Sequence, residues 1–485
     1  MREFFRSLLC VALFLLSGGI STAAEPERGF RAGAYAIDIT PTKFPVSVNG
    51  GMADIQATAA HDPLHARCLV LDDGHKRIAF AVCDSMAIPR SLMEDAKQQV
   101  LQRTGIPVGH ILISATHSHS TVSVTSCFQS DPMPAYQKFM AAKIAEGIEK
   151  AVSQLKPARI GWGKKSNPTQ LFNRRWYLKP GAIGPDPFGR NKDQVRMNPG
   201  QGNPNLVKSA GPIDPEVSIL VAQGTDGQPI ALLANYSLHY VGGVGGSVLS
   251  ADYFGMFAER ISQLLNAQSA NPPFVAIMSN GTSGDVNNVN FALKNPPKRE
   301  PYEQMKLVAE SVAQTAFEAY QEIQFHDAPL LDVREREIDL GVRQAQPGDL
   351  ERAEKILAKV EPKGRVLRGL DEIYARETIK LNDSPKTVHV KLQAIRIGDL
   401  AILAIPCEVF TQIGLDLKQK SPFKQTFTIE LANGYFGYLP TPEQHKLGGY
   451  ETWRARSSFL EEEASPKIMQ QLQEMLGELH AATKK

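Results

Sequence analysis

The feature that most constrains this chain is an alternation of short apolar segments with longer amphipathic ones. The apolar segments, each of strand length, cover residues 77–83, 111–115, 217–222, 230–238, 274–278, 388–397, 400–405 and 427–431. Helical periodicity marks residues 136–152, 252–265, about 304–323 and 468–482. Strands that alternate with helices predict an α/β fold built on one or more central sheets with helices packed against them.

Two histidines stand at the end of one of these predicted strands. The apolar run that starts at Ile111 leads into Thr116-His117-Ser118-His119-Ser120. The ends of strands are where open α/β sheets place their ligands. Two imidazoles at such a place can bind a transition metal or move protons. They can equally serve as structural hydrogen-bonding groups, because a zinc site needs further ligands from elsewhere in the chain.

Other polar groups also follow apolar strands or lie beside glycines. His239 precedes the glycine-rich stretch 241–246, and Glu408 directly follows the strand that ends in Pro406-Cys407. A carboxylate there is either a metal ligand or a charge at a helix N-terminus. Three further segments have the same character: Asn173-Arg174-Arg175-Trp176, the polar turn 280–288, and the aromatic turns around Tyr438 and Tyr450. Each has a purely structural alternative, whether a solvated arginine, a tight turn or aromatic packing.

Composition restricts the class of protein. Apolar residues make up 42% and charged residues 21% of the 485, and the net charge is only +2. These values are ordinary for a soluble globular protein, and no basic run indicates a nucleic-acid partner. Residues 1–24 resemble a secretory signal peptide, with an uncleaved anchor as the alternative, and no later window is apolar enough to span a membrane. The predicted location is therefore secreted or periplasmic.

The rest of the chain, residues 25–485, is expected to form a single domain. A Gly-, Pro- and Asn-rich stretch, residues 173–214, predicts a long loop that either covers the site or is disordered. Residues 347–385 are charged and helical, which indicates a surface insertion. The cysteines Cys68, Cys83, Cys127 and Cys407 lack the spacing of a disulfide framework, and free buried thiols are expected at least for Cys68, Cys83 and Cys407.

Taken together and in order, these motifs resemble the neutral/alkaline ceramidase family, zinc amidases that cleave the N-acyl bond of ceramide. The resemblance rests on Thr-His-Ser-His-Ser, Asn-Arg-Arg, His239, Ser-Ala-Asp-Tyr (250–253), Ser-Gly-Asp-Val (283–286), Pro-Cys-Glu (406–408) and Gly-Tyr-Leu-Pro (437–440). The opening segment 33–41 is also similar to the start of that catalytic domain. The resemblance covers about residues 30–455 and implies central mixed β-sheets flanked by helices.

The resemblance also implies roles for individual residues. The zinc ligands it implies are His117, His239, Glu408 and Tyr438. His119, Arg174 and Tyr450 match residues that line the substrate amide. Such a set of ligands can leave room on zinc for a water, and a zinc-activated water would attack the amide carbonyl. His119 would then protonate the leaving amine. The implied partner is an N-acyl lipid or a related small molecule, with possible contact to a membrane surface.

Three departures from the family pattern bear on the substrate. Asn287 stands where the family has a serine that is regarded as catalytic, and an amide is neither a nucleophile nor a proton acceptor. Ser120-Thr121-Val122-Ser123 replaces the family's Ser-Gly-Pro-Gly type of loop, and the usual C-terminal β-sandwich is expected to be missing. The sequence thus predicts a secreted zinc amidohydrolase acting on ceramide or a related N-acyl amide. The alternative is a catalytically impaired lipid- or glycan-binding protein of the same fold. A metal-independent serine hydrolase is disfavoured, since no Gly-x-Ser-x-Gly elbow occurs.

Overall fold

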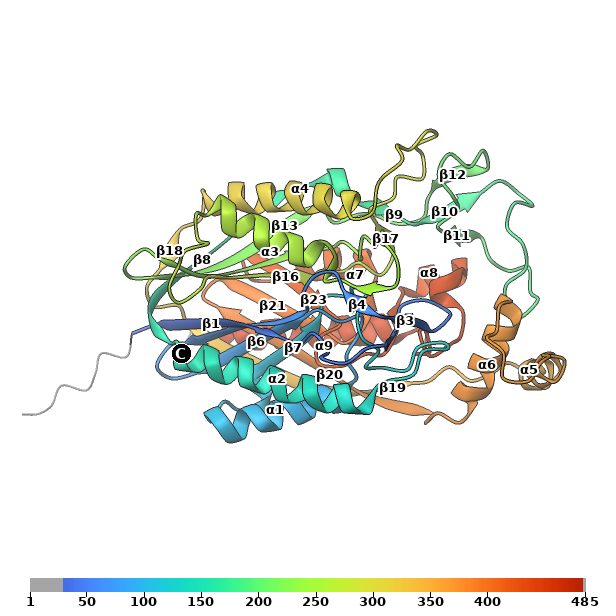
Figure 1. Cartoon of the computed structure of the whole chain (residues 1–485), viewed down its shortest axis with the longest axis horizontal. Coiled ribbons are helices and arrows are strands. Elements are labelled where there is room, and N and C mark those ends of the chain that lie inside the picture. Colours follow the sequence, from blue (N-terminus) through green and yellow to red (C-terminus); the bar gives the residue numbers. More distant parts are fainter. Residues whose placement is uncertain (1–28, 483–485) are drawn as a thin grey trace, which may run out of the picture.

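The chain folds into four layers, helices–sheet–sheet–helices, in a computed structural model that describes residues 29–482 (Figure 1). The predicted signal peptide, residues 1–24, lies outside the described residues. Within the described part of the chain, none of the helices is long and apolar enough to cross a membrane. The layers confirm the predicted class, mixed sheets flanked by helices.

The larger sheet has nine strands and mixed pairing. Its order is β16-β14-β13-β8-β1-β5-β6-β7, and β18 also pairs with β8. The β14–β16 and β6–β7 pairs are parallel, and the other pairs are antiparallel. The strands are β1 Arg31–Asp38, β5 His65–Asp72, β6 Arg77–Cys83, β7 Ile111–Ala115, β8 Lys156–Ser166, β13 Glu216–Gly224, β14 Pro229–Tyr236, β16 Val275–Asn280 and β18 Phe325–His326.

The smaller sheet, ordered β19-β20-β21-β23, packs face to face on the larger one. Its β21–β23 pair is parallel. Side chains such as Phe80 and Leu220 of the large sheet meet Ile402 and Phe427 of the small one in a fully buried apolar layer. The strands are β19 Leu331–Gly341, β20 Thr387–Ile397, β21 Leu400–Ile405 and β23 Gln425–Glu430. Both faces of the central strands are covered, and strands buried on both faces need a nearly continuous run of apolar residues.

Helices cover the two outer faces. One half of the large sheet is covered by α1 and α2 and the other half by α3 and α4, while α7 and α9 cover the small sheet. These helices are α1 Arg90–Thr104, α2 Pro134–Ser153, α3 Asp252–Leu264, α4 Glu303–Tyr320, α7 Thr411–Lys420 and α9 Ala464–Ala481. Each predicted amphipathic segment is thus a helix whose apolar side faces a sheet.

Short elements surround one end of the two sheets. They are β2 Val46–Val48, β3 Ile55–Ala57, β4 Ala59–Ala60, β9 Phe172–Asn173, β15 Val248–Leu249, β17 Val286–Asn287, β22 Glu408–Val409, β24 Tyr438–Leu439, α8 Pro442–Leu447 and two short 3-10 turns, Pro168–Gln170 and Tyr450–Thr452. A further 3-10 turn, Val108–His110, directly precedes β7 and lies at the opposite end of that strand. The bridge between β22 and β24 pairs Glu408 with Tyr438.

Two regions differ from the sequence-based expectation. The segment expected to be a long loop, 173–214, contains a small antiparallel sheet of β10 Arg175–Leu178, β11 Val195–Met197 and β12 Leu206–Ser209. The segment 347–385 forms α5 Asp349–Ala358 and α6 Leu370–Asn382 (orange in Figure 1). The apolar side chains Ile373 and Tyr374 of α6 join the buried core, so this segment is not confined to the surface.

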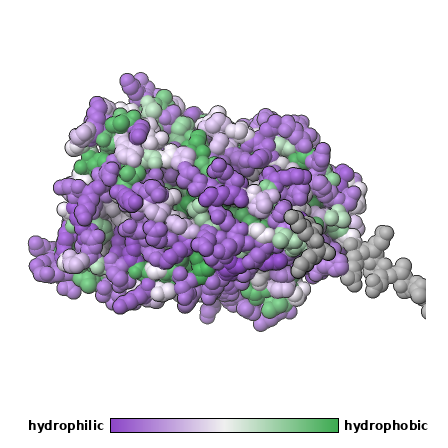
Figure 2. Space-filling view, turned by 180° about the vertical axis from the view of Figure 1, so that it is seen from behind, coloured by the Kyte–Doolittle hydropathy of each residue, from purple (hydrophilic) through white to green (hydrophobic). Residues whose placement is uncertain are grey.

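The four cysteines of the described chain are free and buried. This confirms the expectation for Cys68, Cys83 and Cys407 and extends it to Cys127. The face seen in Figure 2 is predominantly hydrophilic, with apolar residues scattered in small groups, as is normal for a protein surface.

Candidate metal centre and active site

The candidate site lies where strands of both sheets end side by side. The segment after β23 runs against β7, since the Asn433 N–H donates to the Ile113 carbonyl at 2.8 Å and the Ala115 N–H to the Leu431 carbonyl at 3.2 Å. The Asn235 amide of β14 donates to the Thr428 carbonyl of β23. The carboxyl ends of β7, β14, β16, β21 and β23 therefore meet at one corner of the two-sheet stack, as expected for ligand sites in α/β folds.

His117 occupies the centre of this corner. It is buried, and its backbone has a φ of 73°, a left-handed conformation that is uncommon for residues other than glycine. Its Nδ1 lies 2.7 Å from the Met86 carbonyl oxygen, an acceptor, so Nδ1 carries the proton and Nε2 presents a lone pair. Strained backbone and a fixed tautomer are both features of functional sites.

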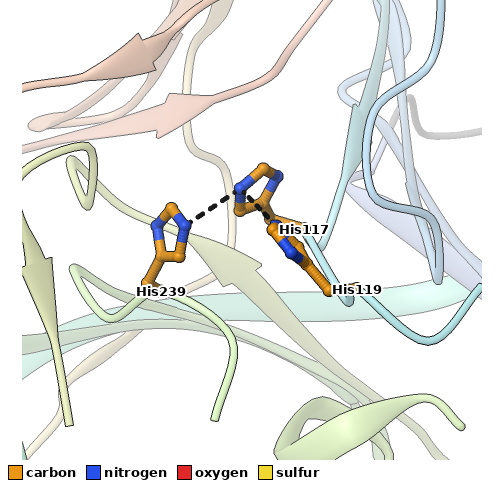
Figure 3. A group of neighbouring side chains, drawn as sticks. All are labelled: His117, His119 and His239. Atoms are coloured by element: carbon orange, nitrogen blue, oxygen red, sulfur yellow. Dashed lines mark hydrogen bonds between the residues drawn. The ribbon is translucent and has the colours of Figure 1, made fainter. Parts of the chain in front are cut away.

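His239 points its Nε2 at the same atom. The two Nε2 atoms are 3.1 Å apart, and the Nδ1 of His239 lies 3.2 Å from the Ser283 carbonyl oxygen (Figure 3). β14 ends at Tyr236, two residues earlier than predicted, so His239 lies on irregular backbone beyond the strand. Both imidazoles are thus anchored through Nδ1 and face each other through Nε2.

His119 completes a group of three histidines. Its Nε2 is 3.1 Å from that of His117, and its ring stacks on Tyr240 with the ring centroids 3.7 Å apart. The backbone of Gly50 hydrogen-bonds the ring and packs against it. One nitrogen from each of His117, His119 and His239 lies within 4.8 Å of the others, an arrangement that can hold a metal ion.

Glu408 brings a carboxylate to the same place. Its Oε2 lies 3.3 Å from His117 Nε2, and Oε1 accepts a hydrogen bond of 2.9 Å from the Tyr435 hydroxyl. Glu408 is 2% exposed, and Oε2 has no hydrogen-bond partner among the described residues. An orphaned buried carboxylate oxygen is costly, and a metal ion would satisfy it. Glu408 begins β22 rather than a helix, so the helix-terminus alternative does not hold.

Tyr438 and Arg174 form the opposite side of the site. The Tyr438 hydroxyl interacts with the Glu408 carboxylate and accepts a hydrogen bond of 3.0 Å from Arg174 Nη2. Arg174 also donates from Nη2 to the Gly284 carbonyl and from Nε to Glu451 Oε1 at 3.0 Å. The alternative of a solvated loop arginine is therefore wrong, because Arg174 is buried and ion-paired.

Tyr450 and Asn287 lie further from the histidines. The Tyr450 ring contacts that of Tyr438, with the centroids 5.9 Å apart. Asn287 lies in β17 and donates from Nδ2 to the Asn198 side-chain oxygen at 2.9 Å, while its Oδ1 accepts from the Val289 N–H. Asn287 lines the same cavity as Arg174 and His239. All eight residues selected from the sequence thus lie in one region, with His117, His119, His239 and Glu408 at its centre.

The electrostatics favour neutral imidazoles beside an ionised carboxylate. Burial, together with the neighbouring Arg174 and His117, holds the pKa of His239 well below its usual value, and the pKa of His119 is lowered for the same reasons. Burial alone would raise the pKa of Glu408, but the adjacent His117 and Tyr438 outweigh it and the pKa is lowered. Neutral imidazoles and carboxylates are the protonation states that bind metals.

Two of the spacings among these side chains are close to those found around a tetrahedral transition metal. Ligands about 2.0–2.1 Å from zinc stand roughly 3.3 Å apart at the corners of a tetrahedron. The 3.1 Å separation of the His117 and His239 nitrogens and the 3.3 Å separation of His117 from Glu408 are close to this value. Nitrogen and oxygen donors are those that zinc accepts in catalytic sites.

Several supporting residues were not identified from the sequence. Tyr435 holds Glu408, and Tyr240 stacks on His119. Ser283 contacts His239 through its carbonyl and hydroxyl, and that hydroxyl donates to the buried Glu430. Tyr435 and Ser283 lie in turns that had been selected from the sequence as possible parts of the site. Glu430 lies inside a predicted strand, and no sequence motif marks a carboxylate there as functional.

Comparison with known proteins gives a fold and not a family assignment. No model of a known protein family matches the sequence. The structure is similar to the crystal structure of neutral ceramidase from Pseudomonas aeruginosa, with a TM-score of 0.71 and 18% identity over 94% of this chain and 75% of that one. A structure described as ceramidase complexed with C2 matches equally well, with a TM-score of 0.71 and 16% identity over 94% of this chain and 76% of that one. The chain therefore has the fold of the ceramidases.

Proposed function

We propose that this protein is a secreted zinc-dependent amidohydrolase that cleaves the N-acyl bond of a lipid amide. The observation that carries the proposal is that His239 Nε2 and the orphaned Glu408 Oε2 lie 3.1 Å and 3.3 Å from His117 Nε2. The ceramidase fold supports amide bonds as the target. His117, His239, Glu408 and Tyr438 would hold the ion, and His119, Arg174, Asn287 and Tyr450 would face the substrate.

Zinc bound here would act as a Lewis acid toward water and the amide carbonyl. His119 is placed to handle protons, because the backbone of Gly50 engages its ring and its Nε2 points to the centre of the site. In the proposed reaction a water oxygen bonds to the carbonyl carbon, and His119 takes the proton that this water loses. As the C–N bond breaks, His119 returns that proton to the amine nitrogen.

Arg174 and Tyr450 would orient the amide and stabilise the charge that develops on its oxygen. Arg174 is already fixed by Glu451, Gly284 and Tyr438, so it need not reorganise during the reaction. Asn287 replaces the motif serine, and its amide is not a nucleophile, so water is the attacking group in this proposal. The alternative, a binding protein without activity, rests on the same replacement.

Metal analysis combined with an amide-hydrolysis assay tests the proposal. The full-length protein is assayed on an N-acyl sphingosine and on simpler N-acyl amines, before and after chelation and with zinc restored. We expect hydrolysis that is lost with the metal and recovered with zinc. His117→Ala and Glu408→Gln should lose most of the bound zinc. His119→Gln should keep its zinc, but its kcat/KM should fall at least 100-fold. The exposed control His75→Gln should behave as wild type in both measurements.

Two results would overturn the proposal. Undiminished zinc content in both His117→Ala and Glu408→Gln would remove the metal site. Zinc-loaded protein that hydrolyses none of the amides would favour the binding-only alternative.

A further inference from the structure

Two cavities with different linings adjoin the candidate site. The first, of about 400 Å³, carries four side-chain amides beside His239 and a few apolar side chains such as Phe291; the amides belong to Asn198, Gln201, Asn287 and Asn288. We refer to it as the amide cavity. The second, of about 260 Å³, is lined mainly by apolar and aromatic side chains such as Met52, Leu370 and Trp453, with the charged Asp193 and Arg196 also in its wall, and is called the apolar cavity.

Arg174 connects the two cavities. It lines the amide cavity, and its Nη2 donates to the hydroxyl of Tyr438, whose ring contacts Tyr450 of the apolar cavity. The backbone makes a second connection, since Met197 lines one cavity and the next residue, Asn198, lines the other. The two cavities therefore flank the Arg174–Tyr438 side of the site, and a substrate that used both would place its amide bond at Arg174.

The amide cavity suits a neutral group that forms hydrogen bonds. Arg174 is the charged side chain in its lining, and its charge is balanced by Glu451. Asn287 uses one N–H on Asn198 and keeps a second, while no hydrogen bond to the Asn288 side chain occurs within residues 29–482. A hydrocarbon chain lying here would cover these amides without pairing them, which is unfavourable for each amide that is buried.

We propose that the substrate carries one hydrocarbon chain and one small, uncharged, hydroxylated amine, joined by the scissile amide. The acyl chain occupies the apolar cavity, and the hydroxylated amine occupies the amide cavity. A ceramide has a second long chain, which the amide cavity would receive poorly. This inference rests on the proposed amidohydrolase function and specifies its substrate class.

Matched substrates test the inference on the zinc-loaded, full-length protein. N-dodecanoyl serinol carries the predicted hydroxylated amine, and N-dodecanoyl butylamine carries an apolar amine of similar size. We expect kcat/KM to be at least 10-fold higher for the serinol amide than for the butylamide, and higher than for N-dodecanoyl sphingosine. A site that hydrogen-bonds a substrate hydroxyl discriminates against the analogue that lacks it.

Variants assign the preference to the two cavities. Asn288→Leu should reduce the serinol-to-butylamide ratio at least fivefold, whereas the exposed control Asn191→Leu should leave it unchanged. Met197→Trp should raise KM for N-dodecanoyl serinol and not for N-acetyl serinol, because only the long chain needs the apolar cavity.

The outcomes separate this inference from the proposed function. Equal or faster hydrolysis of the butylamide or of the ceramide overturns the inference and leaves the amidohydrolase intact. An unchanged ratio in Asn288→Leu also overturns it. Failure to cleave any of these amides overturns the proposed function instead.

Discussion

At the scale of single residues, the site depends on side chains whose second polar atom is held by the surrounding protein. His117 is fixed through Nδ1 by the Met86 carbonyl, and Glu408 is fixed through Oε1 by Tyr435. In each case the other polar atom points to the centre of the site. Such supporting contacts set the orientation and tautomer of metal ligands, and their loss typically lowers metal affinity 10–100-fold.

Gly50 provides a test of how closely His119 must be positioned. Gly50 has a φ of 110°, and a Cβ atom added there would lie 2.5 Å from His119 Cγ. Gly50→Ala should therefore push the His119 ring out of place and lower kcat/KM about 100-fold, while zinc content stays near that of wild type. Steady-state kinetics and metal analysis check this expectation.

Gly227→Ala is the matched control, because Gly227 also has a positive φ, 84°, but has no atom within 4 Å of the added Cβ. It separates the cost of backbone strain from displacement of the ring. Equal activity losses in the two variants would contradict a specific role for Gly50.

At the scale of elements, short strands and turns hold the two sides of the site together. Pairing of β22 with β24 sets Glu408 beside Tyr438. Glu451, in the turn Tyr450–Thr452, bonds Arg174 through Oε1 and Arg175 through Oε2 at 2.6 Å. This buried Arg-Glu-Arg group ties β10 to the turn that carries Tyr450.

Removing the Glu451 carboxylate should leave the buried positive charges of Arg174 and Arg175 without the negative charge that balances them. Glu451→Gln is expected to lower the free energy of unfolding by about 3 kcal/mol, since breaking a buried ion pair on one side costs about 3–5 kcal/mol. Urea denaturation measures the loss. The exposed Glu443→Gln in α8 is the control, with an expected change within about 0.5 kcal/mol. A Glu451→Gln variant as stable as the control would contradict this role.

At the scale of the whole molecule, acid should destabilise the fold through histidines that are kept neutral. Burial, with Arg343 and Arg175 nearby, lowers the pKa of His445 from 6.5 to about 3. Below pH 6.5 the unfolded chain therefore binds a proton that the folded chain does not, so stability falls as the pH falls. Between pH 7.5 and 5.5, the free energy of unfolding of the wild type should fall by about 1 kcal/mol more than that of His445→Gln. Urea denaturation of both proteins at the two pH values measures this difference. Equal losses in the two proteins would show that His445 is not involved.

The sequence predicted the strands and helices that form the layers better than it predicted the side-chain contacts where the two sheets meet. Apolar runs located the central strands, and the order of the motifs selected His117, His239 and Glu408. The roles of Tyr435, Ser283 and Glu430 depend on how two sheets meet at one corner, and no local pattern records that meeting. The strands of residues 173–214 were missed because each is only three or four residues long and lies in a stretch rich in Gly, Pro and Asn. The core position of Tyr374 was missed because its helix carries many charged residues.

Anomalous diffraction at the zinc edge, from crystals of the zinc-loaded protein, tests the central claim most directly. The account predicts one strong peak about 2.0–2.1 Å from the Nε2 atoms of both His117 and His239, with a carboxylate oxygen of Glu408 in the same coordination sphere. A zinc-loaded crystal with no peak at this corner, or with a peak that His117 and Glu408 do not contact, would contradict it.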